Sequence, residues 1–438
     1  MFDWDEFFSA ARIETVDDSI VKQKVTCHSL KTAGDCRSPF ERDYGRVIYS
    51  SLFRRLAGKT QALPDTKIDH VRNRLTHSIE VSDIAGSILR EVGYLLLERN
   101  GLKLCRMEDA YWVVRTAGLA HDIGNPPYGH AGERAIRTWG TCYFERHPEL
   151  MTVASDFMRF DGNAQSFRLL SRNDLGVSDG ISLTAASLAA IVKYPYSVSD
   201  QRAMSGKFNA FKTEADILDA IMSEVKLNEP NGYFRRHPLS FILEAADDMA
   251  YVLSDLEDAV YMEIISQDEK NVLFQELLMR NSKQRKISMS KSAMQSAVAT
   301  ILVKGYAKAF YNSIERIFTD RLFDGHALEL ALPKNVREWM TDVGRIRKRI
   351  INSEYVKVAE KRGEKLIVTM LDRMVGIMPY VGMNGHGKPK VQVATLIRKT
   401  FGNEFFNANK TQSAEWWLHA ILDYVSGMTD AYLQELAG

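Results

Sequence analysis

Residues 121–133 read His121-Asp-Ile-Gly-Asn-Pro-Pro-Tyr-Gly-His130-Ala-Gly-Glu133. The apolar spacing before this stretch predicts a helix over residues 109–120. The stretch itself ends that helix, because proline lacks the N–H group that a helix needs and its ring clashes with the preceding turn. The glycines and prolines predict a loop that folds back sharply, and a short helix is expected to restart around His130.

His130 and Glu133 are three residues apart, so they share one face of the restarting helix. A carboxylate that holds an imidazole fixes its orientation and raises its pKa, which suits a general acid. The loop that brings His130 back beside His121 favours this interpretation. Without the loop, Glu133 would be better explained as a solvated helix residue.

Three predicted helices carry further histidines and carboxylates. Apolar residues recur at helical spacing over about 76–101 and 240–264, as they do over 109–120. His77 lies near the start of the first helix, His121 and Asp122 follow the second, and Asp247 lies within the third. Two imidazoles and two carboxylates suit a divalent cation and leave coordination sites open for water and phosphate. An isolated His-Asp pair at a helix end would carry little weight.

Asp247, Tyr251 and Asp255 are spaced four and four, so they project from one helix face. This polar row lies within an otherwise apolar helix, where buried charges are costly unless they are paired or bound to metal. The alternative is an exposed acidic stripe that includes Asp248. Composition does not decide which of the two adjacent aspartates binds metal, but the face shared with Tyr251 and Asp255 favours Asp247.

Helical spacing also extends over residues 212–226, 291–319, 364–378 and 412–436, and strand patterns are sparse. The fold class is therefore expected to be mainly α. The glycine-rich segment 380–392 is expected to form a loop or one small β-hairpin. The helical pattern is interrupted more weakly near residues 320–335. This predicts a helical body up to about residue 320 with a helical C-terminal region packed on it.

The composition is that of a soluble globular protein, with 45% apolar and 26% charged residues among 438. The 57 basic and 56 acidic residues leave a net charge of +1. This balance argues against a dedicated electrostatic nucleic-acid binder but not against a local basic patch. The four cysteines form no CxxC pair, and the N-terminal residues lack a signal-peptide pattern. We therefore expect a cytoplasmic protein with reduced thiols, and no apolar run predicts a membrane span.

The order His…His-Asp…Asp resembles the HD-domain phosphohydrolases. Three segments look like the bacterial dGTP triphosphohydrolases: Arg54-Arg-Leu-Ala-Gly-Lys-Thr-Gln61, Arg72-Asn-Arg-Leu-Thr-His77-Ser and the run 121–133. The blocks Asp161-Gly-Asn-Ala-Gln165, Lys193-Tyr-Pro195 and Glu244-Ala-Ala-Asp-Asp-Met-Ala-Tyr251 extend the match. The chain is more distantly similar to the human sterile-alpha-motif/HD dNTPase. The resemblance covers roughly residues 37–260, and the run 125–133 is far more specific than the His-Asp pair.

The resemblance implies a role for each matching position. One divalent metal ion, Mn²⁺ or Mg²⁺ in the first place and Fe²⁺ or Ni²⁺ as alternatives, would be held by His77, His121, Asp122 and Asp247. The catalytic pair beside the α-phosphate would be His130 and Glu133. Phosphate oxygens would be bound by Arg74, Lys193 and Tyr194. The deoxyribose would be contacted by Gln61, Tyr251 and Asp255, and a further polar contact would come from Asn163. The alternatives without a role in substrate binding are that Lys193 and Tyr194 extend to solvent at a helix end and that Asn163 caps a helix.

The implied reaction is metal-dependent hydrolysis of dGTP or several dNTPs to deoxynucleoside and inorganic triphosphate. We expect an N-terminal extension (1–36), an HD phosphohydrolase core (37–320) and a helical C-terminal region (321–438) for base recognition and oligomer contacts. The family implies homo-oligomers, often hexamers, and sometimes allosteric nucleotide sites. It leaves open whether His130 acts as general acid or orients the nucleophile.

Two alternatives remain. One is an HD phosphohydrolase that acts on nucleoside monophosphates or an alarmone. The other is a nucleic-acid-binding protein on an HD scaffold, with the basic run Arg345-Ile-Arg-Lys-Arg349 and the loop Gly385-His-Gly-Lys-Pro-Lys390 as its footprint. A basic run is more often a solvated helix face. Binding of single-stranded DNA is compatible with catalysis.

Overall fold

The computed structural model describes residues 4–16, 19–23, 36–61, 70–97, 104–172, 180–281, 289–319, 324–381 and 391–437. Within these residues the chain is mainly helical, and one antiparallel hairpin pairs β1 (Arg12–Val16) with β2 (Ser19–Gln23). The predicted mainly α fold is therefore confirmed. This hairpin lies within the first 36 residues. Residues 382–390, where the sequence predicts a loop or one small hairpin, lie outside the described residues, so that prediction stays untested.

The α-helices are α2 (Pro39–Tyr49), α3 (Ser51–Arg55), α4 (Arg74–Leu97), α5 (Leu104–Ala120), α6 (His130–Arg146), α7 (Ala154–Met158), α8 (Gly162–Ser171), α9 (Ala185–Ile191), α10 (Ala215–Glu224), α11 (Pro238–Tyr261), α12 (Gln267–Asn281), α13 (Lys291–Thr319), α14 (Gly325–Leu330), α15 (Lys334–Ile351), α16 (Glu354–Met374), α17 (Val391–Thr400), α18 (Asn403–Asn409), α19 (Ala414–Ser426) and α20 (Asp430–Ala437). Short 3₁₀ segments are η1 (Trp4–Phe7), η2 (Leu56–Gly58), η3 (Pro148–Leu150), η4 (Gln201–Ser205), η5 (Lys212–Glu214) and η6 (Val375–Tyr380). Among the described helices, none is both long and apolar enough to cross a bilayer.

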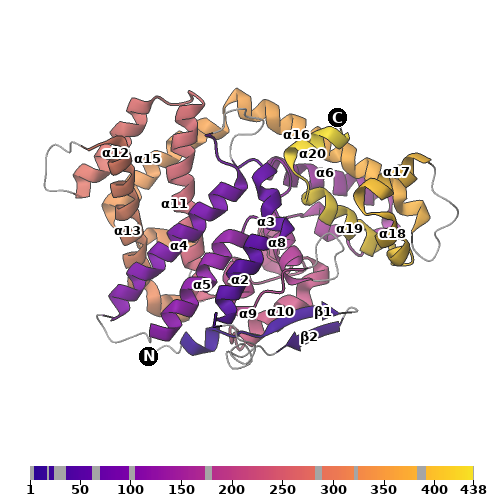
Figure 1. Ribbon diagram of the computed structural model, residues 1–438, viewed down its shortest axis with the longest axis horizontal. Coiled ribbons are helices and arrows are strands. Elements are labelled where there is room, and N and C mark those ends of the chain that lie inside the picture. The colour runs from indigo at the N-terminus through magenta and orange to yellow at the C-terminus, as the bar shows by residue number, and fades with distance from the viewer. Residues whose placement is uncertain are drawn as a thin grey trace.

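Helices α4 and α5 pack side by side at the centre of the molecule (Figure 1), and α11 packs against both. Helices α2 and α9 cover α5, and α13 covers α4. Gly118 allows the close approach of α4 and α5, because a Cβ there would meet the Ser82 backbone at 2.6 Å. The start of α4, the end of α5 and the middle of α11 are therefore brought together where the predicted metal ligands lie.

A second apolar cluster lies beside this centre. It joins α6, α7 and α8 to the helices that follow residue 354, with Trp139, Phe157, Ile367 and Trp417 among its buried members. Figure 1 shows α16 to α20, coloured orange to yellow, gathered at one end of the molecule over α6. The C-terminal helices thus pack directly on the segment that carries His130. The division of the chain at residues 36 and 320 remains a prediction.

Several helices differ from their predicted extents. The helix that restarts at His130 is long, not short, and residues 412–436 form two helices, α19 and α20, rather than one. The helix predicted over 364–378 begins ten residues earlier, at Glu354. Some helices gave no amphipathic signal, because they are buried on every side: all residues of α9 are buried.

His237 forms the N-terminal cap of α11, the helix that carries Asp247. Its Nδ1 accepts a hydrogen bond from the Leu239 backbone N–H, and its Nε2 donates to the Phe7 carbonyl at 3.3 Å. The side chain is fully buried between the rings of Phe7 and Phe8. Burial lowers the pKa of His237 to about 4, so the imidazole is neutral in the folded protein at neutral pH.

This buried imidazole predicts a loss of stability in acid. The unfolded chain takes up a proton near pH 6.5 but the folded chain only near pH 4, so the contribution is complete above pH 6.5 and is lost as the pH falls towards 4. Between pH 7.5 and 4.5 the free energy of unfolding of the wild type should fall by about 2.5 kcal/mol more than that of His237→Gln, which keeps both hydrogen bonds but does not titrate. Urea unfolding of the two proteins at both pH values measures this difference. Equal pH dependence in the two proteins would contradict it.

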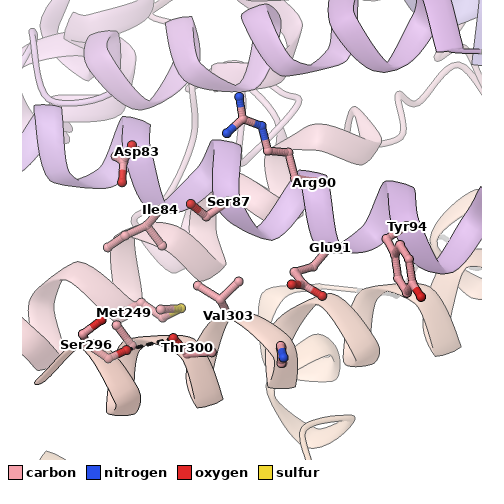
Figure 2. Close-up of a pocket in the computed structure, with 12 residues that line it drawn as sticks. Asp83, Ile84, Ser87, Arg90, Glu91, Tyr94, Met249, Ser296, Thr300 and Val303 are labelled. Carbon is pink, nitrogen blue, oxygen red and sulfur yellow. Dashed lines mark hydrogen bonds between the residues drawn. The ribbon is translucent and has the colours of Figure 1, made fainter. Parts of the chain in front are cut away.

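A cavity of about 750 Å³ lies between α4 and α13. Figure 2 shows Asp83, Ser87 and Glu91 of α4 on one side and Thr300 and Val303 of α13 on the other. Met249 of α11 completes the lining. His77 and the other predicted metal ligands do not line this cavity.

Candidate active site

The four predicted metal ligands converge from three helices. His77 lies in the first turn of α4, His121 and Asp122 follow α5 directly, and Asp247 lies in the middle of α11. The ligand atoms of His77, His121 and Asp122 lie within 4.8 Å of one another. His77 Nε2 is 3.1 Å and His121 Nε2 is 3.5 Å from Asp247 Oδ1. Asp248, the neighbouring candidate, is exposed.

The donor atoms of this cluster fit a divalent cation. His121 Nδ1 donates to the Gly118 carbonyl at 2.8 Å, which directs Nε2 into the cluster with its lone pair available. That Nε2 atom is buried and has no hydrogen-bond partner, although Asp122 Oδ1 lies 3.5 Å from it. Burial lowers the pKa of His121 and the carboxylates of Asp122 and Asp247 raise it, with a net rise. A cation held between the same groups would favour the neutral imidazole instead.

Outer contacts fix both carboxylates. Asp122 Oδ2 accepts from Arg74 Nη1 at 2.8 Å, and Oδ1 accepts from Asn125 Nδ2 at 2.5 Å. Lys193 Nζ donates to Asp247 Oδ2 at 3.2 Å. Burial would raise the pKa of each carboxyl group, but Arg74 lowers that of Asp122 and Lys193 lowers that of Asp247, so both remain ionised.

The turn after Asp122 delivers His130 to the first residue of α6. Tyr128 and Gly129 both have left-handed backbone conformations, with φ of 59° and 54°. Glycine is favoured at residue 129 by its positive φ, and a Cβ there would also displace the end of the Arg74 side chain, since Nη2 would lie 2.5 Å from it. The sharp return that the prolines and glycines predicted is therefore present.

His130 and Glu133 face each other on this helix. His130 Nδ1 is 3.5 Å from Glu133 Oε2, at the outer limit of a hydrogen bond, and 78% of the His130 side chain is exposed. Glu133 is buried, and its Oε1 accepts from the Gly162 N–H at 2.8 Å. Burial raises the pKa of Glu133, but the contacts with His130 and Gly162 lower it overall. An ionised, oriented carboxylate beside an accessible imidazole can support proton transfer.

A cavity of about 120 Å³ adjoins the cluster. Its lining includes Arg74, His130, Gln61, Tyr251 and Asp255. The Tyr251 ring lies 4.9 Å from the His77 ring, between centroids. Both amide atoms of Gln61 are buried and have no hydrogen-bond partner among the residues that the structure describes. Since buried polar groups normally have partners, this amide is suited to a ligand hydroxyl.

The remaining predicted residues lie elsewhere. Lys193 and Tyr194 follow α9, where both backbone N–H groups donate to Asn209 Oδ1, and they line a separate cavity of about 540 Å³. The Lys193 side chain pairs with Asp247 instead of extending to solvent. Asn163 Nδ2 donates to Asp161, the N-cap residue of α8, at 2.7 Å. Asn163 does not line the 120 Å³ cavity.

The HD domain family matches residues 74–165, a range that includes Arg74, His77, His121, Asp122 and the His130–Glu133 pair. Deoxyguanosinetriphosphate triphosphohydrolase-like proteins of Pseudomonas aeruginosa and Listeria monocytogenes are each 30% identical to the chain, with 92% of this chain and 93% of the relative aligned. A protein of the same name from Synechocystis is 38% identical over 279 residues, 59% of this chain and 60% of the relative.

The chain belongs to the deoxyguanosinetriphosphate triphosphohydrolase-like family. It is therefore an HD-domain phosphohydrolase with a cluster that could bind a metal ion. The alignment with these triphosphohydrolase-like relatives extends over nine-tenths of the chain, well beyond the motifs at 37–260.

Part of the site of this triphosphohydrolase-like protein comes from residues beyond 320, where the sequence showed no motif. Arg347 and Ile351 of α15 and Val356 and Glu360 of α16 line the 120 Å³ cavity. Arg347 lies over the Tyr251 ring at 4.4 Å from its centroid. Its only signal in the sequence is the basic run at 345–349, which belongs to the footprint of the alternative nucleic-acid-binding function. The other suggested footprint, at 385–390, lies outside the described residues.

Arg347 also pairs with Asp255, with Nε 3.4 Å from Oδ2. Burial raises the pKa of Asp255 to about 6, against the lowering effect of Arg347. The neighbouring arginines point to different partners: Arg345 pairs with Asp342 and Arg349 with Glu269. The run at 345–349 is therefore divided between the cavity and the helix surface.

Helix α20 of this family member contacts two of the residues that line the 120 Å³ cavity, Thr60 and Tyr128. Asp430 Oδ2 accepts from the Thr60 backbone N–H at 2.9 Å and from its hydroxyl at 2.5 Å. Asp430 Oδ1 accepts from the Tyr128 N–H at 3.1 Å. Thr60 precedes Gln61, and Tyr128 belongs to the left-handed turn before His130. The buried Asp430 carboxylate thus positions Gln61, which follows Thr60, and His130, which follows the turn at Tyr128.

Asp430→Asn should lower kcat about tenfold with little change in cation affinity. The amide presents an NH₂ group to one of the donors, so a hydrogen bond to a charged acceptor is lost and the turn loosens. A stability loss alone would be reproduced by Leu422→Ala, which removes a buried side chain from α19. Steady-state kinetics well below the unfolding temperature compare the two variants. Similar kcat values would show that Asp430 acts only through stability.

Proposed function

We propose that the protein hydrolyses deoxynucleoside triphosphates to a deoxynucleoside and inorganic triphosphate. The observation that carries the proposal is the small polar cavity, with the unpartnered amide of Gln61, directly beside the four-residue cluster. At about 120 Å³ it falls below the roughly 300–1,000 Å³ of complete ligand sites. It therefore suits a sugar whose base and phosphates extend from it. The names of the relatives support the same reaction.

His77, His121, Asp122 and Asp247 would hold one divalent cation. A cation held there would supply Lewis-acid chemistry at a phosphate. Mn²⁺ and Mg²⁺ are the ions to test first, while Fe²⁺ and Ni²⁺ also tolerate nitrogen and oxygen ligands. The residues around the cluster then determine which phosphate lies against it.

Arg74 and Lys193 would bind the oxygens of the triphosphate, with Tyr194 beside them. Each cation lies next to a carboxylate of the cluster, Arg74 at Asp122 and Lys193 at Asp247. A phosphate between them would be neutralised from two sides, as recognition of a polyphosphate requires. Asn163 is a further candidate contact, from the start of α8.

Gln61 and Asp255 would bind the 3′-hydroxyl of the sugar, and the Tyr251 ring would pack on its face. The ring is held between His77 and Arg347. A ring fixed on both sides cannot move to admit an additional hydroxyl, so a 2′-hydroxyl would be excluded. Both sugar contacts line the same cavity as His130.

His130 would transfer or hold the proton at the scissile bond. Hydrolysis at the α-phosphorus makes the nucleoside 5′-oxygen the leaving group, which needs a proton. The Glu133 carboxylate faces the imidazole and would orient it. His130 would either protonate the 5′-oxygen or orient the attacking water.

The deciding experiment is a product assay with all four dNTPs and their ribonucleotide counterparts, with added Mn²⁺ or Mg²⁺. Release of free triphosphate with the deoxynucleoside is expected. Orthophosphate or pyrophosphate as the product would refute the proposal. Hydrolysis of a nucleoside monophosphate or an alarmone, without dNTP hydrolysis, would favour the other HD phosphohydrolase activity.

Replacing Tyr251 should relax the discrimination against ribonucleotides. In Tyr251→Ala the ratio of kcat/KM for a dNTP to that for the matching ribonucleotide should fall at least about tenfold, which corresponds to about 1.4 kcal/mol of lost discrimination. Tyr251→Phe keeps the ring and should retain the wild-type ratio. An unchanged ratio in the alanine variant would remove Tyr251 from sugar selection.

A further inference from the structure

A larger cavity, of about 540 Å³, lies on the other side of Lys193. Its lining contains four basic side chains, Lys193, Arg202, Arg235 and Arg236, and two acidic ones, Glu229 and Asp324. Among the lining residues the positive charges exceed the negative ones by two, whereas in the cavity between α4 and α13 Arg90 and Lys304 are matched by Asp83 and Glu91. Lys193, Arg202 and Arg236 also pair with Asp247, Asp200 and Glu244, which do not line the cavity. The cavity beside Lys193 is therefore suited to an anion.

Aromatic rings fix two of these arginines. The Arg202 guanidinium lies 4.4 Å from the Tyr196 ring centroid and 4.2 Å from that of Tyr233. The Arg236 guanidinium lies 4.2 Å from the centroid of Phe241. A guanidinium held on a ring face loses little conformational entropy when it binds a phosphate through its edge.

Each of these guanidinium groups keeps one nitrogen available. Asp200 accepts from Arg202 Nε and Nη2, at 2.9 and 2.8 Å. Arg236 Nε donates to Ser240 Oγ at 3.1 Å and Nη2 donates to Glu244 at 2.8 Å. Neither Nη1 atom makes a hydrogen bond within the described part of the chain. Two donor groups are thus available to an occupant of the cavity.

The 540 Å³ cavity and the 120 Å³ cavity lie at opposite ends of one stretch of α11. Phe241 lines the former and Tyr251 and Asp255 line the latter, with Asp247 between them. Asp247 lies six positions after Phe241 along the helix, about 9 Å at 1.5 Å per residue. Lys193 spans the gap, since it lines the cavity and donates to Asp247.

We propose that this cavity is a polyphosphate-binding site that receives the triphosphate released at the cluster. The inference rests on the proposed function, which splits the substrate between its sugar and its first phosphate. The nucleoside remains on the Tyr251 side, and a highly charged triphosphate has to leave from the other. Lys193, Arg202 and Arg236 form the cationic surface for it, and the phosphate tail of a second nucleotide would present the same chemistry.

The test is calorimetric titration of the full chain with inorganic triphosphate, without substrate. Arg202→Gln/Arg236→Gln should weaken binding at least about tenfold, since charge-assisted hydrogen bonds are lost. Arg146→Gln removes an exposed arginine from α6, outside the cavity, and should bind within about twofold of wild type. If the double variant does not fold, Arg202→Gln alone, on the short segment η4, should weaken binding about threefold or more.

Unchanged binding in the arginine variants would overturn the proposal. If wild type binds triphosphate through these arginines but releases none from dNTPs, the site stands and the proposed function fails. If triphosphate is released from dNTPs but the arginine variants bind it with wild-type affinity, the proposed function stands and the proposed site is wrong. Competitive inhibition of dNTP hydrolysis by triphosphate supports the released product as the occupant. A second nucleotide at saturating concentration could instead change the rate of dNTP hydrolysis. If that change is lost in the arginine variants, the occupant is the phosphate tail of the second nucleotide.

Discussion

Replacing His130 with alanine should lower kcat by roughly 100- to 10,000-fold, the range for loss of a positioned acid or base. Metal affinity should remain within about twofold of wild type, because His130 is not among the four clustered ligands. Stability should also be unchanged, since 78% of its side chain is exposed. The measurements are single-turnover kinetics, titration with Mn²⁺ and thermal unfolding.

His326→Ala is the matched control. His326 also faces a glutamate three residues later on a helix, with Nδ1 3.6 Å from Glu329 Oε2, and 71% of its side chain is exposed. Its removal should leave kcat unchanged. Turnover at the wild-type rate in His130→Ala would exclude His130 as the proton-transfer residue, and an equal loss in both variants would point to a general effect of removing a surface histidine.

Asp247→Asn should abolish turnover by removing the metal ion. The amide keeps the shape of the side chain but loses the charge that Lys193 and the two histidines face. Loss of outer-shell partners alone lowers metal affinity about 10- to 100-fold, so loss of a ligand charge should exceed about 100-fold. Titration with Mn²⁺ and the metal content of the purified protein measure this effect.

Asp248→Asn is the corresponding control, because it removes the adjacent, exposed carboxylate from the same helix. It should retain both metal and turnover. If the two variants lose metal equally, the cluster at His77 is not the metal site. High concentrations of Mn²⁺ should restore part of the turnover of Asp247→Asn, and restoration at wild-type concentrations would contradict the assignment.

The parts of the site that could be predicted are those with local causes. Proline and glycine chemistry predicted the turn before His130, and the spacing of Asp247, Tyr251 and Asp255 predicted that they share a face. Helix periodicity also predicted α13 at its observed bounds, because α13 has one apolar face. In each case the physical reason lies within one or two turns of chain.

The remainder depends on contacts between distant segments. Arg347 reaches Asp255 and Tyr251 only because α15 packs on α11, and nothing in its own neighbourhood separates it from Arg345 or Arg349. Asp430 meets Thr60 across 370 residues. Helices α8 and α9 are buried on nearly every side, so they present no polar face from which their period could be recognised.

The contact of Asp430 with Thr60 and Tyr128 has a consequence for synthesis. A nascent chain still attached to the ribosome can form the helices around His77 and His121 long before residue 430 has left the exit tunnel. During that interval the turn ahead of His130 lacks its carboxylate anchor, so the proposed hydrolysis should run about tenfold slower until residue 430 has folded into place. Chains halted shortly before residue 430 should therefore show only this reduced rate, even where their own helices fold.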